Sequence, residues 1–325
     1  MIKLKSISDD DKNAFLGNTL PRLVNALSAI KAYVTTHRLV GHPLEKLIDY
    51  IEKHSSSLEE GAKKLILASR AEMKNIISEV GVIPTPNRLK KEEKIDEANL
   101  VTSLLKVYTD FSDSDLGYVW GERLGVKTCP YCNRSYIFTV TSDHKKRPEY
   151  DHYYPKSSYP YLCASIYNIV PCCKICNSAK SKADPFDPDH GIIYPFTEEF
   201  GYDINFVVEY KEVMGLLDGK ISISIKPNAH GYSLFSRIQD GISRFSLEDL
   251  YNSHADYASD LIRLLHIYTP SFVQSLMQTY PEILRGGVED VKNLLFITYL
   301  EKEQWGERVL AKFTHDVVNQ FYDFF

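Results

Sequence analysis

All six cysteines of this chain lie between residues 129 and 176 of its 325 residues. Four of them form two Cys-x-x-Cys pairs, Cys129 with Cys132 and Cys173 with Cys176. Two such pairs let two backbone turns each present two thiolates, which completes the tetrahedral ligand set of a structural zinc ion. Because forty residues separate the pairs, zinc held by them would enclose a folded segment and constrain it from both ends.

Two alternative roles for the cysteines fit the sequence less well. A thioredoxin-like redox pair accounts for one Cys-x-x-Cys and does not predict a second. A zinc nucleobase deaminase needs His-x-Glu and Pro-Cys-x-x-Cys, but tyrosines follow His152 and an isoleucine stands where the second cysteine should be. Within the zinc interpretation, Cys172 could replace Cys173 as a ligand, and Cys163 is expected to be an ordinary buried cysteine.

The cellular compartment bears on the same question. The first residues lack the apolar core of a secretory signal, and no stretch approaches the roughly 18 apolar residues of a membrane-spanning helix. We therefore expect a cytoplasmic protein, in which structural disulfides are disfavoured and clustered cysteines indicate a metal site.

Charge is distributed unevenly along the chain. The formal net charge is −5, yet residues 125–185 carry nine lysines and arginines against four acidic residues, a local net charge of +5. The rest of the chain therefore carries −10. A basic island in an acidic protein is typical of a phosphate-binding face, and it is equally typical of a solvated loop.

Four polar residues lie inside the cysteine frame: Asp151, His152, Asn168 and Asn177. Phosphodiester hydrolysis needs an activated water and a cation that stabilises charge on the phosphate. A neutral imidazole can take a proton from water near neutral pH, which suits His152. Carboxylate and amide oxygens are ligands for Mg²⁺ or Mn²⁺, which suits Asp151 and Asn177.

This arrangement resembles the HNH (ββα-metal) endonuclease motif over about 60 residues, with asparagine at the third position. The resemblance implies a ββα-metal nuclease module stabilised by zinc. In such a module Asp151 and Asn177 hold one catalytic divalent cation, Mg²⁺ or Mn²⁺, and His152 is the general base. Asn168 orders the loop and helps to orient His152.

A wider similarity is carried by residues 129–134, 151–157, 167–171 and the helical tail, which resemble PtuB-type HNH effectors. Those nucleases belong to Septu and retron anti-phage systems. The resemblance therefore implies an ATPase partner of the PtuA type, and in retrons a larger complex. It favours DNA as the substrate, with RNA or tRNA left open. The acidic remainder of the chain predicts that efficient cleavage needs the partner.

The local geometry of the motif raises a difficulty. Successive side chains of a strand point to opposite faces, so Asp151 and His152 should diverge unless the strand ends, twists or bulges there. Asn177 and Lys180 share one face of the predicted helix. Lys180 and Arg134 are candidates for contact with substrate phosphate, although each could equally be a solvated side chain.

The remaining segments predict a mainly helical α+β protein in three units. Residues 1–120 are expected to be helical, 121–190 to form the nuclease module, and 191–325 to form a short sheet followed by helices. Ser57 and Ser246 each begin a capping-box pattern. Segments 206–210 and 221–225 have strand character, with Asp218-Gly219 as the turn between them.

A second functional class competes with the enzyme. A zinc module without catalytic activity could bind nucleic acid or a partner protein, and it too would carry the four cysteines. Only the enzyme predicts that Asp151, His152 and Asn177 converge around an oxygen-ligated cation.

Overall fold

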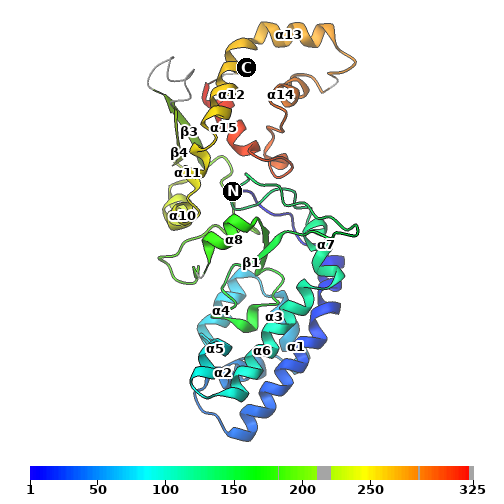
Figure 1. Ribbon diagram of the computed structural model, residues 1–325, viewed down its shortest axis with the longest axis vertical. Helices are drawn as coiled ribbons and strands as arrows, with labels where there is room; N and C mark the ends of the chain where they lie inside the picture. Colours follow the sequence, from blue (N-terminus) through cyan, green and yellow to red (C-terminus); the bar gives the residue numbers. More distant parts are fainter. Residues whose placement is uncertain (182, 211–220, 285, 322–325) are drawn as a thin grey trace.

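The computed structural model describes residues 1–325 apart from 182, 211–220, 285 and 322–325, and only the backbone of residue 289. The molecule is elongated, with the amino-terminal helices at one end, the carboxy-terminal helices at the other, and short strands between them (Figure 1). The expected mainly helical α+β composition is confirmed.

The amino-terminal half is helical. Its elements are α1 (Asp9–His37), α2 (Pro43–His54), α3 (Leu58–Leu67), α4 (Arg70–Val80), α5 (Pro86–Lys91), α6 (Ile95–Ser112) and α7 (Asp115–Arg123). Helix α1 packs against α3 and α6, because Leu23, Leu27 and Ile30 recur at helical spacing and are buried. Helix α7 spans the boundary expected at residue 120.

The middle of the chain holds β1 (Glu149–His152), the 3-10 turn η1 (Pro160–Leu162), β2 (Ile169–Cys172) and α8 (Lys174–Lys180). Strands β1 and β2 pair antiparallel, with Asp151 opposite Val170 and His152 opposite Ile169. Helix α8 follows β2 directly and packs against β1. The segment between the cysteine pairs therefore holds a two-stranded sheet, and the helix that follows carries Cys176 of the second pair.

The carboxy-terminal part begins with a second antiparallel pair. It comprises β3 (Ile204–Tyr210), β4 (Ile221–Pro227), α10 (Tyr232–Arg244), α11 (Leu247–Asn252), α12 (Ala255–Ile267), α13 (Pro270–Thr279), α14 (Val288–Phe296), η2 (Lys302–Gln304) and α15 (Ala311–Phe321). Both strand predictions are confirmed, and the predicted Asp218-Gly219 turn lies outside the described residues.

The two capping-box patterns have different outcomes. Ser57 caps α3, since its side chain accepts a hydrogen bond from the Glu60 amide. Helix α11 begins where Ser246 predicts, but the Ser246 backbone is left-handed and its side chain makes no cap bond, so that part of the prediction is wrong. A left-handed residue cannot adopt the extended backbone that a capping side chain requires.

The amino-terminal helices brace the loop between β1 and β2. The Ile166 amide donates to the Ile66 carbonyl at the end of α3, 2.8 Å away, and the Tyr161 hydroxyl donates to the Gly81 carbonyl after α4, also 2.8 Å. The Cys163 thiol donates to the Leu104 carbonyl of α6 over 3.2 Å. The long helical region therefore positions the loop on which part of the candidate site stands.

The first cysteine pair is anchored to the carboxy-terminal part through Asn133. This side chain is fully buried and its φ is +52°. Its Nδ2 donates to Thr128 Oγ1 and to the Trp305 carbonyl, at 3.1 and 3.0 Å. Asparagine tolerates the left-handed backbone and satisfies several polar groups at once, which suits this junction.

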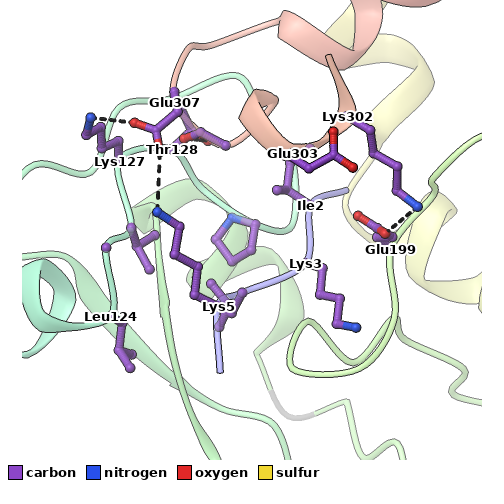
Figure 2. Close-up of a pocket in the computed structure, with 15 residues that line it drawn as sticks. Ile2, Lys3, Lys5, Leu124, Lys127, Thr128, Glu199, Lys302, Glu303 and Glu307 are labelled. Atoms are coloured by element: carbon purple, nitrogen blue, oxygen red, sulfur yellow. Dashed lines mark hydrogen bonds and ion pairs between the residues drawn. The ribbon is translucent and has the colours of Figure 1, made fainter. Parts of the chain in front are cut away.

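A cavity of about 350 Å³ opens beside this junction (Figure 2). It is lined by the start of the chain, residues 124–130 and the η2 region. Three of its four lysines are paired: Lys5 and Lys127 both pair with Glu307, and Lys302 pairs with Glu199. The cavity therefore lies where these segments meet. Because these lysines are already paired with glutamates, the cavity is not a candidate phosphate site.

Candidate metal centre and polar site

The two cysteine pairs come together in the fold. The Sγ atoms of Cys129, Cys132, Cys173 and Cys176 all lie within 4.8 Å of one another. The separation of Cys132 Sγ from Cys173 Sγ is 4.0 Å, close to the ~3.8 Å edge of a tetrahedron with Zn–S bonds of about 2.3 Å. The four thiols could therefore hold a metal ion such as zinc.

Local backbone structure prepares these sulfurs to carry charge. The amides of Cys173, Arg134 and Cys176 donate to Cys129, Cys132 and Cys173 Sγ, each over 3.4 Å. Hydrogen bonds from the neighbouring thiols hold the pKa of Cys173 well below its usual range, whereas burial raises the pKa of Cys129, so in the absence of a metal the four thiols do not all ionise together. Thiolate character is what a metal ligand requires.

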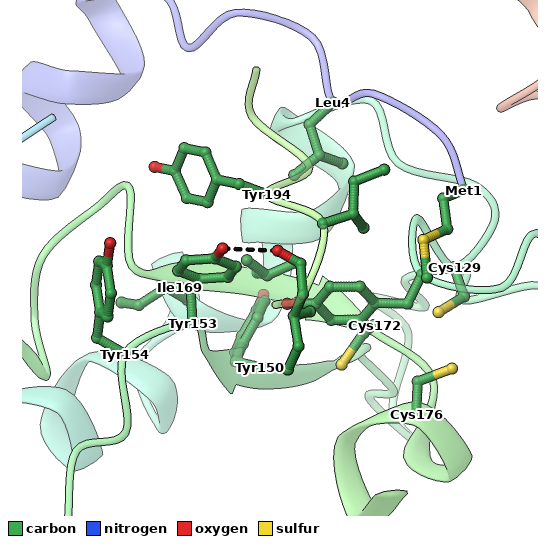
Figure 3. Packing of buried hydrophobic residues seen from close by; sticks show 14 of the residues in the cluster. Met1, Leu4, Cys129, Tyr150, Tyr153, Tyr154, Ile169, Cys172, Cys176 and Tyr194 are labelled. Carbon is green, nitrogen blue, oxygen red and sulfur yellow. Dashed lines mark hydrogen bonds between the residues drawn. The ribbon is translucent and has the colours of Figure 1, made fainter. Parts of the chain in front are cut away.

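The positions of Cys172 and Cys173 distinguish them as candidate ligands. Cys173 is the cap residue of α8, and its sulfur belongs to the four-cysteine group. Cys172 ends β2 and is buried outside that group, as Cys163 is. Figure 3 shows Cys129, Cys172 and Cys176 within the same packed interior.

Strand β1 presents two different faces to its surroundings. Glu149 and Asp151 point toward α8, where their partners are Asn177 and Lys180. Tyr150 and His152 point the other way, toward α7 and α6. Strand β1 thus keeps its regular alternation through His152. The side chains of Asp151 and His152 therefore lie on opposite faces of the strand, as expected for a regular strand.

Asp151 is enclosed by two donors. Its Oδ1 accepts from Lys180 Nζ at 3.0 Å, and its Oδ2 accepts from the Tyr131 hydroxyl at 2.7 Å. Lys180 Nζ also donates to the His152 carbonyl at 2.6 Å. The side chains of Lys180 and Asp151 are only 1% and 5% exposed. Lys180, predicted as a phosphate contact, is instead placed in the interior and out of reach of a solvent-borne phosphate.

His152 is held in a defined orientation. Its Nε2 lies 2.9 Å from the Cys163 carbonyl, and its ring packs edge-on against Tyr108 with centroids 4.3 Å apart. Burial, assisted by the nearby Lys156, lowers the pKa of His152 to about 3, so the imidazole is neutral at neutral pH. Because a carbonyl can only accept, Nε2 carries the proton and Nδ1 carries the lone pair.

Asn168 orders the loop that follows β1. Its Oδ1 accepts from the Tyr154 amide at 2.7 Å, and its Nδ2 donates to the carbonyls of Tyr154 and Leu162, each 3.0 Å away. Leu162 directly precedes Cys163, whose carbonyl holds His152. Asn168 is fully buried and therefore connects the loop to the orientation of the imidazole.

The remaining predicted residues lie farther out. Asn177 is partly exposed, and its Nδ2 donates to Glu149 Oε2 over 3.4 Å. Arg134 Nε donates to His254 Nε2 at 3.0 Å. Burial and Arg134 lower the pKa of His254, so it serves as a neutral acceptor. Arg134, the other candidate for contact with phosphate, thus already uses one of its nitrogens in a hydrogen bond within the protein.

Asp151, His152 and Asn177 therefore do not converge on one point. Within the described part of the chain, the four cysteines are the only group of three or more histidine, cysteine or acidic side chains close enough to share a metal ion. Both carboxylate oxygens of Asp151 already accept hydrogen bonds. The residues as arranged do not fit the expected Mg²⁺ or Mn²⁺ site.

Several residues of the site have no sequence signal of their own. Tyr108 comes from α6 and Tyr131 from the first cysteine turn, while Lys156 and Cys163 belong to the loop after β1. Tyr131 lies between the predicted ligands Cys129 and Cys132, and this position could have identified it as a site residue. Tyr108 reaches His152 only through tertiary packing.

Comparisons with protein-family models, curated proteins and solved structures find no match to this chain. Among the helices that the structure describes, none has both the length and the apolar character needed to cross a bilayer.

Proposed function

We propose that the chain is an HNH-type endonuclease that hydrolyses nucleic-acid phosphodiester bonds, with His152 as the general base and zinc on the four cysteines. The observation that carries the proposal is the fixed, neutral imidazole of His152, held by a carbonyl on a loop that Asn168 orders. The order of β1 and β2 between the cysteine pairs, followed by α8, which carries Cys176, supports it.

The tautomer of His152 suits this role. Its Nε2–H is committed to the Cys163 carbonyl, so Nδ1 is the atom that can accept a proton. None of the described residues bonds to Nδ1, which is also not one of the buried atoms without a partner. His152 keeps only 7% of its surface exposed, and the proposal requires that a water molecule reach Nδ1 there.

The divalent cation is a separate matter. The resemblance to HNH nucleases assigns Mg²⁺ or Mn²⁺ to Asp151 and Asn177, but Lys180 and Tyr131 occupy the Asp151 oxygens. We therefore derive no step through that cation. A cation at Asp151 would have to displace the Lys180 ammonium first.

The rival function is a zinc module that binds nucleic acid or a protein without catalysis. Two observations favour this rival: Asp151 and His152 lie on opposite faces of β1, and Lys180 binds the Asp151 carboxylate. The oriented, neutral imidazole of His152 favours the enzyme. The two functions differ in whether a substrate is cleaved.

Partners and biological role follow from the resemblance alone. We propose that the nuclease is an effector of an anti-phage system and acts with an ATPase partner of the PtuA type. DNA is the favoured substrate. The net charge of −10 outside residues 125–185 opposes unaided binding of nucleic acid, so the partner is expected to raise the cleavage rate.

A substrate panel tests the proposal. The purified chain is incubated with duplex DNA, single-stranded DNA, total RNA and tRNA, each with Mg²⁺, with Mn²⁺ or with chelator, and with or without the co-expressed ATPase. We expect cleavage of at least one substrate, DNA first. Binding without cleavage under every condition would leave the zinc binding module as the better interpretation.

A further inference from the structure

One cation beside His152 takes no part in the proposed proton transfer. Lys156 Nζ lies 4.4 Å from the centre of the Tyr108 ring. The same ring packs against His152, with centroids 4.3 Å apart. An ammonium group and a general base therefore border one aromatic side chain.

The backbone presents Lys156 at a fixed place. The amides of Ser158 and Tyr159 both donate to the Pro155 carbonyl, at 3.0 and 2.9 Å, so residue 156 lies inside a closed turn. That turn follows β1 and belongs to the loop whose Cys163 carbonyl holds His152. Lys156 and His152 are thus positioned by one loop.

Lys156 differs from Lys180 in what it contacts. Lys180 is buried and bonded to Asp151 and to the His152 carbonyl. Lys156 is exposed, and no carboxylate within the described residues forms an ion pair with it. Its charge also acts on the imidazole, since Lys156 contributes to the lowered pKa of His152.

An unpaired ammonium over an aromatic face is suited to bind an anion. The ring attracts the cation and keeps it partly away from water, which strengthens its interaction with a phosphate. A phosphate contacting Lys156 would lie next to the Tyr108 ring against which His152 packs. This is where a phosphodiester must lie if His152 is to activate the attacking water.

We propose that Lys156 binds the substrate phosphate next to His152, the role that the sequence pattern predicted for Lys180. The inference rests on the proposed nuclease function and names a residue of its substrate site. The ligand is the phosphodiester backbone, so the contact strengthens binding of any nucleic-acid sequence alike.

The test measures binding apart from cleavage. His152→Ala full-length protein, which should not cleave, is titrated with a fluorescent DNA duplex at several salt concentrations. In this background Lys156→Gln should weaken binding about tenfold and lower the slope of log affinity against log salt by about one. Lys156→Arg should retain most of the affinity.

Lys174→Gln is the matched control, because Lys174 is an exposed lysine of the same basic segment but lies on α8, beside the other face of β1. It should change neither affinity nor slope. An unchanged slope in Lys156→Gln, or no binding of nucleic acid at all, would overturn the inference. If DNA binds through Lys156 and wild-type protein never cleaves, the proposed function fails and the phosphate site stands.

Discussion

The Lys180 ammonium lies 3.0 Å from the Asp151 carboxylate, and both side chains are buried. The pair joins the last residue of α8 to strand β1, one residue before His152. It therefore stabilises the contact between helix and sheet. It also occupies an oxygen of the Asp151 carboxylate, which the motif assigns to a divalent cation.

Removing one member of this pair should be costly. Lys180→Met leaves the Asp151 charge buried without its partner, which is expected to lower the free energy of unfolding by about 3 kcal/mol. Urea unfolding measures this loss. The double variant Asp151→Asn with Lys180→Met should recover part of it, and Lys31→Met, at an exposed ion pair, should change little. Equal stability of Lys180→Met and wild type would contradict the claim that Lys180 and Asp151 form a buried ion pair.

The metal centre predicts different behaviour for neighbouring cysteines. Cys173→Ser removes a ligand and should reduce bound zinc well below about one ion per chain. Cys172→Ala should retain the full zinc content, because its sulfur lies outside the four-cysteine group. Zinc is measured by mass spectrometry on purified protein. Loss of zinc from Cys172→Ala, with retention in Cys173→Ser, would reverse the assignment.

Asn168 should matter for stability more than Asn177 does. Asn168→Ala leaves the Tyr154 amide and carbonyl without their buried partner and takes one of two donors from the Leu162 carbonyl, at a cost of about 3 kcal/mol in unfolding free energy. Asn177→Ala removes one long bond near the surface and should cost little. Denaturant unfolding of both variants gives the comparison. A larger loss in Asn177→Ala would argue against the loop-ordering role.

His315 predicts a loss of stability in mild acid. Its Nδ1 lies 3.0 Å from the Leu300 carbonyl and its Nε2 lies 2.8 Å from Asn319 Nδ2. Burial, with the nearby Lys312, lowers the pKa of His315 from 6.5 to about 4. Below pH 6.5 the unfolded chain therefore binds a proton that the folded chain does not, so stability falls as the pH drops from 6.5 toward 4.

Between about pH 7 and pH 5 this group should lose about 1–2 kcal/mol of stability, allowing for its partial exposure. His315→Gln cannot titrate and should show a correspondingly smaller loss. The measurement is the difference between wild type and variant in urea unfolding at the two pH values. Parallel losses in both proteins would show that His315 does not carry the effect.

The sequence predicted the metal centre better than the polar site. The spacing of a Cys-x-x-Cys pair is local, so it identifies the candidate ligands directly. Choosing Cys173 over Cys172 required the end of β2 and the start of α8, because that boundary decides which side chain turns toward the cluster.

The polar site depends on contacts that the sequence does not encode locally. Strand alternation anticipated the divergence of Asp151 and His152 on a regular strand. Helical spacing placed Lys180 on the same helix face as Asn177. It could not predict that Lys180 is buried, because burial depends on which partners the rest of the fold supplies. Tyr108 reaches His152 from a helix more than forty residues earlier in the chain, and such contacts have no local pattern.

The most direct test of the central claim is the single-turnover cleavage rate of His152→Ala on the best substrate of the panel. Loss of a general base should slow cleavage at least about 100-fold, while zinc content stays near that of the wild type and the variant remains folded at the assay temperature. His230→Ala, at an exposed histidine, should cleave at the wild-type rate. Cleavage by His152→Ala at that same rate would contradict the role of His152 as the general base.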